Sequence, residues 1–131
     1  PAARALAAQV LERLGLAARR DAPGSALTLP DRKRLEVARA LATQPRLLLL
    51  DEVMAGLRPT ECDQMVEVLR TLNRQDGVTI LLIEHVMRAV MALAQHIVVL
   101  HHGQIVARGT PDQVVRDPAV LECYLGEDAE V

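Results

Sequence analysis

Hydrophobic and polar residues along the chain form blocks that predict helices and strands in alternation. Apolar side chains recur at helical spacing in residues 2–14 and again in the stretches that begin at Thr28, Thr60 and Val86. Two apolar runs, 47–50 and 78–83, are too short to span a membrane, and they suit strands buried on both faces. This alternation favours an α/β fold with a mainly parallel sheet.

The last third of the chain has shorter blocks. Residues 97–100 and 105–107 read as two strands joined at His102-Gly103, a pair that suits a tight hairpin turn. Thr110-Pro111 and Asp117-Pro118 each predict the start of a short helix, and the acidic tail 127–131 is expected to be frayed. The sequence therefore predicts a hairpin and two short helices after the alternating part.

Helix starts are marked by hydroxyl residues that are followed, three positions later, by an acid. Thr28 with Asp31, and Thr60 with Asp63, both have the spacing of a capping box. Pro30 falls in the first turn of its helix, where a missing N–H is tolerated. We expect both helices to be capped in this way.

Composition narrows the choice of class. Half of the 131 residues are hydrophobic, yet Phe and Trp are absent and Tyr124 is the only aromatic residue, so the core must be aliphatic. The net charge of −2 argues against a dedicated nucleic-acid surface. Cys62 and Cys123 lie outside any metal-ligand spacing and are expected to be free thiols. With no signal peptide and no apolar run of membrane length, we expect a soluble, cytoplasmic protein.

Polar side chains follow both apolar runs at the point where the predicted strands end. Asp51 and Glu52 follow the first run, and Glu84 and His85 follow the second. Ligands bind beyond the carboxyl ends of the strands in a parallel sheet, so these residues are candidates for chemistry. The alternative is that they are ordinary polar ends of core strands, and we interpret Glu84 in that structural way.

Four motifs give the chain a specific resemblance. LTLPDRKRLEVARALATQPRLLLLDE is similar to the signature helix and Walker B strand of ABC-type ATPases, and AGLRPTE is similar to their D-loop. LLIEHVMRAV resembles the switch-histidine segment, and IVVLHHGQIVARGTPDQVV resembles the hairpin and helix that follow it. The ending RDPAVLECYLGE resembles the ATP-binding subunit of branched-chain amino-acid transporters. The resemblance covers residues 26–126 and implies a partial domain of the P-loop NTPase-like fold.

The resemblance also implies domain organisation and residue roles. It makes residues 1–131 the C-terminal portion of one nucleotide-binding domain, with a helical subdomain part over 1–44 and the Walker B part over 45–131. Asp51 would hold Mg²⁺ through water, Glu52 would be the general base, and His85 would sense the γ-phosphate. The residues implied to contact the partner subunit's ATP or to lie at the dimer seam are Thr28, Leu29, Pro30 and Asp31 of the signature loop and Ala55, Gly56 and Leu57 of the D-loop.

The sequence departs from the family pattern in three places. Leu27–Asp31 stand where the family has Leu-Ser-Gly-Gly-Gln, and Val53 replaces a proline. The chain contains no G-x-x-x-x-G-K-S/T and no glutamine-bearing loop. The sequence therefore looks like the C-terminal half of a longer subunit, and this chain alone is not expected to bind ATP well.

The first hypothesis is an ATP-hydrolysing subunit of an ABC importer for branched-chain amino acids. It would dimerise with a second ATP-binding subunit and meet transmembrane permease subunits at the inner face of the membrane. A second hypothesis is a non-catalytic dimerisation or protein-interaction module derived from an ABC ATPase. A third is an ATPase of the same superfamily in DNA repair, against which the near-neutral charge and the transporter-like ending count.

Overall fold

The computed structural model describes residues 1–125, and the chain divides into two units, one ending at Ala89 and the other beginning at Val90. The division falls inside one short helix, α4 (Met87–Leu93). In the first unit, the elements are α1 (Ala2–Arg13), η1 (Ala17–Arg19), η2 (Gly24–Ala26), α2 (Leu29–Leu41), β1 (Leu47–Asp51), α3 (Pro59–Arg74) and β2 (Thr79–Ile83). The predicted alternation of helices and strands is confirmed.

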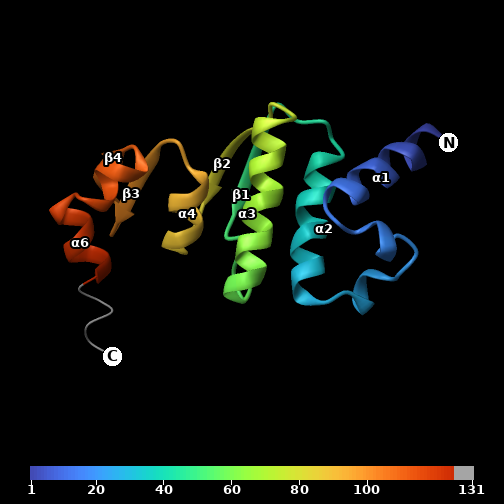
Figure 1. Cartoon of the computed structure of the whole chain (residues 1–131), viewed down its shortest axis with the longest axis horizontal. Coiled ribbons are helices and arrows are strands. Elements are labelled where there is room, and N and C mark those ends of the chain that lie inside the picture. Colours follow the sequence, from blue (N-terminus) through green and yellow to red (C-terminus); the bar gives the residue numbers. More distant parts are fainter. Residues whose placement is uncertain (126–131) are drawn as a thin grey trace. The chain divides into compact units, whose positions relative to one another are not determined.

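The centre of the first unit is a parallel pair of strands. β1 and β2 pair in register from Leu47 opposite Thr79 to Asp51 opposite Ile83. The chain between them runs back through α3, whose ribbon is drawn in front of the strand pair in Figure 1. The inward residues of α3 are buried at helical spacing, as predicted for Met65, Leu69 and Leu72. The parallel register places the carboxyl ends of both strands together.

Burial of the two strands differs from the expectation. Leu48 and Leu50 are buried, whereas Leu47 and Leu49 are exposed, and the pattern alternates along β1. The outward residues of β2 are likewise exposed. The prediction that these strands are buried on both faces is wrong for the described chain, because its helices cover only one face of the pair.

The helix caps are confirmed only in part. Thr28 caps α2, since its Oγ1 accepts a hydrogen bond from the Asp31 N–H at 3.4 Å, but the Asp31 carboxylate does not return a bond to Thr28. It lies instead 3.9 Å from Nε of Arg19. The cap predicted for the next helix, Thr60 with Asp63, is wrong. α3 begins at Pro59 with Arg58 as its N-cap, two residues before the predicted cap.

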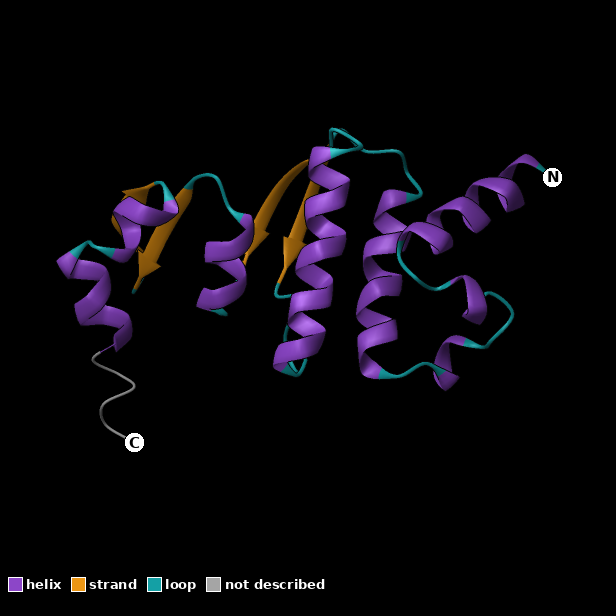
Figure 2. Ribbon diagram, viewed as in Figure 1, coloured by secondary structure: helices purple, strands orange, loops and turns teal. Residues whose placement is uncertain are grey.

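The second unit is built on an antiparallel hairpin, β3 (Ile97–His101) with β4 (Gln104–Gly109), followed by α5 (Pro111–Val115) and α6 (Pro118–Leu125), as Figure 2 shows. His102 and Gly103 form the turn with φ of 49° and 75°, which suits a two-residue hairpin turn. The buried core of this unit consists of Ile97, Val99, Ala107, Val114 and Val120. The predicted hairpin and both predicted helix starts are confirmed, and the tail 127–131 lies outside the described residues.

The remaining predictions about the chain concern its thiols and its helices. Both Cys62 and Cys123 are free, as expected. Burial raises the pKa of the Cys62 thiol, and its Sγ faces the carbonyl of Leu57 at 3.9 Å. None of the helices within residues 1–125 is both long enough and apolar enough to cross a membrane.

Candidate functional site

The carboxyl ends of β1 and β2 bring three of the predicted site residues to one edge of the parallel pair. Asp51 is the last residue of β1, and its register partner is Ile83 at the end of β2. The ladder continues one bond further, because the N–H of Glu52 donates to the carbonyl of Ile83 at 2.9 Å. His85 follows β2 two residues later. The parallel pairing of β1 and β2 thus places the backbone of all three residues at the same edge.

Glu52 and His85 face one another across this edge. Oε1 of Glu52 lies 3.5 Å from Nδ1 of His85, and the two side chains remain 55% and 64% exposed. A carboxylate beside an imidazole, both open to solvent, can hold and transfer a proton to or from a bound group. The strand ends alone predicted that these residues would meet at one edge, whereas their roles as base and switch histidine were expected only through the family resemblance.

The backbone of Glu52 is unusual for a residue with a side chain. Its φ is +51°, in the left-handed region that residues other than glycine rarely adopt. The N–H of Ala55 donates to the Glu52 carbonyl at 3.2 Å, so the chain turns sharply straight after the strand. Strained backbone of this kind gathers at functional sites, where the surrounding structure holds it in place.

Asp51 presents its carboxylate at the exposed end of β1. Among the described residues, no group of three or more His, Cys, Asp or Glu side chains could hold a metal ion by itself. Asp51 offers one carboxylate, and Mg²⁺ is commonly held by one or two carboxylates together with waters and phosphate oxygens.

Glu84 is the residue at this edge that the sequence reasoning undervalued. Its side chain is fully buried, although Glu52 and His85 beside it are open. One carboxylate oxygen accepts the N–H of Met54 at 2.9 Å, and the other accepts the N–H of His85 at 3.2 Å. The sequence held no signal for this role, since an acid directly before the candidate histidine can face either solvent or the loop beyond the neighbouring strand.

The signature segment and the D-loop meet within the first unit. Gly56 has a φ of +78°, and a Cβ placed on it would lie 2.9 Å from Cδ2 of Leu29. The glycine therefore allows a close approach that no other residue would allow without a shift. Within residues 1–125, no hydrogen bond or ion pair connects the 28–31 segment to Asp51, Glu52 or His85.

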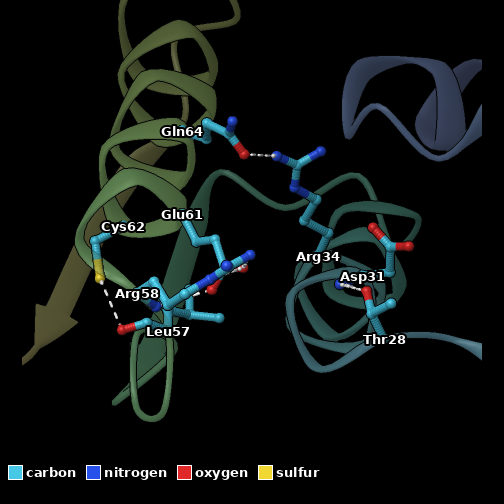
Figure 3. Close-up of polar contacts among 8 residues, drawn as sticks. All are labelled: Thr28, Asp31, Arg34, Leu57, Arg58, Glu61, Cys62 and Gln64. Carbon is cyan, nitrogen blue, oxygen red and sulfur yellow. Dashed lines mark hydrogen bonds and ion pairs between the residues drawn. The ribbon is translucent and has the colours of Figure 1, made fainter.

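Polar contacts fix the two helices that carry these segments (Figure 3). Arg34 of α2 donates from Nη2 to Oε1 of Gln64 on α3 at 3.1 Å. At the start of α3, the Glu61 carboxylate accepts both the backbone N–H of Arg58 at 2.8 Å and its guanidinium. The Arg58 guanidinium lowers the pKa of Glu61, and Glu61 raises the pKa of Arg58.

Comparison with known proteins finds relatives of the kind that the sequence motifs resemble. A family model described as "Branched-chain amino acid ATP-binding cassette transporter" matches residues 104–130. The high-affinity branched-chain amino acid transport ATP-binding protein LivG of Escherichia coli (strain K12) is 44% identical over 121 residues, which is 92% of this chain and 48% of that protein. The lipopolysaccharide export system ATP-binding protein LptB of Acidithiobacillus ferridurans is 37% identical over 94% of this chain and 51% of its own length. The chain spans about half the length of the curated relatives it matches.

Solved structures of ABC ATP-binding cassettes share this fold. The crystal structure of an ATP-binding cassette of an ABC transporter in its ADP conformation matches with a TM-score of 0.87 and 32% identity, over 96% of this chain and 51% of that one. A nucleotide-free cassette from an ABC transporter matches with a TM-score of 0.82 at the same identity, over 91% of this chain and 48% of its own. The resemblance to ABC ATP-binding subunits of the branched-chain amino-acid type is confirmed, and so is the partial P-loop NTPase-like fold.

Proposed function

We propose that this chain is the C-terminal portion of the ATP-binding subunit of an ABC importer for branched-chain amino acids, where it helps to couple ATP hydrolysis to transport. The observation that carries the proposal is the pairing of Glu52 with His85 at the carboxyl ends of two parallel strands. Similarity to proteins named for branched-chain amino acid transport supports the choice of solute. In this proposal, the chain is the C-terminal portion of one nucleotide-binding domain. Residues 1–44 are part of its helical subdomain, and residues 45–131 run from the Walker B strand onward.

In this proposal, Asp51 and Glu52 at the end of β1 have different roles. Asp51 is the residue that would hold Mg²⁺ through water, and the ion would neutralise charge on the phosphates. Glu52 takes a proton from the attacking water, for which its exposed carboxylate at the strand end is suited. His85 donates a hydrogen bond to the γ-phosphate, and the carboxylate of Glu52 at 3.5 Å orients its ring.

The signature segment and the D-loop act between subunits in this proposal. Thr28, with its hydroxyl at the N-terminus of α2, contacts the γ-phosphate of ATP held by a second ATP-binding subunit, together with Leu29, Pro30 and Asp31. Gly56 lies at the seam between the two subunits. Its close packing on Leu29 ties the two segments into one surface. The further partners are transmembrane permease subunits, and the location is the cytoplasmic side of the membrane.

This chain by itself is proposed to bind ATP poorly and to be inactive. It contains no glycine-rich loop with a lysine, the element that supplies a nest of backbone N–H groups and a positive charge to the phosphates. Asp51 and Glu52 alone offer only negative charge to a polyanion. Calorimetric titration of the 131-residue chain with Mg-ATP should show no micromolar binding, and a saturable micromolar isotherm would contradict this statement.

The experiment that tests the function uses the full-length subunit in its transporter complex. Glu52→Gln should keep ATP binding and reduce phosphate release by about 100-fold or more, because the amide cannot accept the proton. Glu67→Gln, on the exposed face of α3, is the matched control and should leave the rate unchanged. Unchanged hydrolysis in Glu52→Gln would refute the role of Glu52 as the base.

A second candidate function is a non-catalytic dimerisation module. The observation in its favour is the row of exposed apolar side chains on the outward face of the parallel pair, formed by Leu47, Leu49, Leu81 and Ile83. A full-length subunit that assembles but hydrolyses no ATP under any condition would favour this candidate over the ATPase.

A further inference from the structure

Glu84 has an environment that a carboxylate rarely occupies. Its side chain has no exposed surface, and acidic residues are almost never fully buried unless partners satisfy them. Both oxygens are satisfied by backbone groups, Oε1 by the N–H of Met54 at 2.9 Å and Oε2 by the N–H of His85 at 3.2 Å. Bonds from N–H groups to an ionised acceptor are stronger than neutral ones, so this carboxylate is a firm attachment point.

The two groups that Glu84 holds belong to the two segments carrying the proposed base and histidine. Met54 lies two residues after Glu52, is itself buried, and sits in the sharp turn closed by the bond from Ala55 to the Glu52 carbonyl. His85 carries the imidazole that lies 3.5 Å from Glu52. One side chain therefore connects the backbone beyond β1 to the backbone beyond β2.

The backbone conformation of Glu52 explains why the contacts of Glu84 matter. A glutamate with φ of +51° needs its neighbours to hold it there. Its N–H donates to the carbonyl of Ile83 and its own carbonyl accepts the N–H of Ala55, while the N–H of Met54 in the same turn donates to the Glu84 carboxylate. Without the Glu84 carboxylate, the turn would be free to relax and the Glu52 side chain would leave His85.

We propose that Glu84 is a positioning residue for the proposed ATPase reaction, holding Glu52 and His85 in register by binding the backbone of Met54 and His85. The buried carboxylate of Glu84 also lies 3.9 Å from Nδ1 of His85. It acts through Glu52 and His85 and not on the nucleotide. The proposal rests on the proposed function for its effect on rate, whereas its structural part concerns the chain alone.

The structural part is tested on the 131-residue chain by amide hydrogen exchange resolved at single residues by NMR. Glu84→Gln keeps the size of the side chain but offers one acceptor oxygen in place of two, with an NH₂ group facing the other backbone N–H. We expect exchange at Met54 or His85 to become about 10-fold faster or more, with amides in the core of α3 unchanged. Glu67→Gln is the control. Unchanged exchange at both amides would overturn the proposal.

The catalytic part is tested on the full-length subunit. Glu84→Gln should lower kcat by about 10- to 100-fold while the KM for ATP stays within about threefold, since only the positioning of the base is lost. Glu84→Asp, which keeps the charge but is one methylene shorter, should restore part of kcat, and it also serves if the glutamine variant does not fold. An unchanged kcat despite faster exchange, or an equal change in KM and kcat, would overturn the positioning role. If Glu52→Gln leaves ATP hydrolysis unchanged, the proposed function is refuted instead. The hydrogen-exchange result would still stand in that case.

Discussion

Leu49 and Leu81 are register partners on the two parallel strands, and their side chains are 65% and 58% exposed on the same outward face. Leu47 and Ile83 extend this face along the strands. Single exposed leucines are common on protein surfaces, but a contiguous row across two strands marks a surface that another element or chain covers.

We therefore expect the isolated 131-residue chain to self-associate through this face. The double change Leu49→Thr with Leu81→Thr introduces β-branched side chains, which suit strands, while removing much of the apolar area, so it should shift the chain towards the monomer. Light scattering over a dilution series measures the change. Val115→Thr, at an exposed position of α5, is the matched control and should not alter the association. A wild-type chain that stays monomeric throughout would contradict the prediction.

Gly56 should be sensitive to the addition of a single methyl group. Gly56→Ala places a Cβ 2.9 Å from Leu29 at a φ of +78°, so both strain and crowding act against it, and we expect the free energy of unfolding to fall by about 1–2 kcal/mol. Urea denaturation provides the measurement. Gly77→Ala has a φ of +67° without any neighbour within 4 Å and should show the strain alone, whereas Gly24→Ala meets open space and should be nearly neutral. Equal losses at positions 56 and 77 would show that the contact with Leu29 is unimportant, and equal losses at positions 24 and 56 would contradict the prediction as a whole.

The order of elements was predictable from the sequence because periodicity and turn residues are local signals. The prediction at Thr60 failed for a local reason as well, since Pro59 is favoured in the first turn and Glu61 reaches the N–H of Arg58. A three-residue spacing suggests a capping box, but two spacings overlapped here. The sequence does not show which of the two spacings forms the cap, because that depends on how far each side chain reaches.

Burial of the strands and the role of Glu84 were beyond the reach of sequence patterns. Four leucines in a row predict burial on both faces, yet which face is covered depends on which elements pack there, and in the described chain Leu49 has no cover. Likewise, a glutamate before a histidine gives no sign that its carboxylate points inward. The contact with Met54 is separated by 30 residues in sequence and follows only from the pairing of β1 with β2.

Glu61 should make the stability of the first unit depend on acid pH. The Arg58 guanidinium and backbone N–H lower its pKa in the folded chain below the usual value of 4.5. A lowered folded pKa means that the ionised form stabilises the fold above the unfolded pKa, and this contribution is lost as the pH falls through the folded pKa. Glu61→Gln should therefore be less stable than wild type at neutral pH, with the difference shrinking below about pH 4.5. Thermal melts at several pH values measure it, with Glu12→Gln as the surface control. A difference that is constant with pH would contradict the assignment.

The altered signature segment should make ATP-driven association of the full-length subunit weak and its turnover slow. If the proposed function holds, residues 28–31 face a phosphate of the partner subunit's ATP. Thr28 keeps a hydroxyl there and the N-terminus of α2 keeps its positive dipole, but Pro30 has no N–H to donate and Asp31 adds a negative charge. At a distance of about 6 Å and an effective dielectric constant of about 20, one such pair of charges repels by about 3 kcal/mol.

The structure adds a partial offset to this repulsion. Arg19 approaches the Asp31 carboxylate at 3.9 Å, with the two side chains partly exposed, so it compensates for only part of the charge. The double change Pro30→Gly with Asp31→Gly should therefore raise steady-state phosphate release at saturating ATP, even though two glycines in the first turn cost about 1–2 kcal/mol of stability. Asp31→Asn removes the charge while keeping the N–H that bonds Thr28, and it should give the electrostatic part of the gain alone. Asp21→Asn, in the exposed loop before α2, is the matched control for removing one acid. If the double variant and Asp31→Asn are both equal to wild type or slower, then residues 28–31 do not face the nucleotide, and their proposed role is wrong.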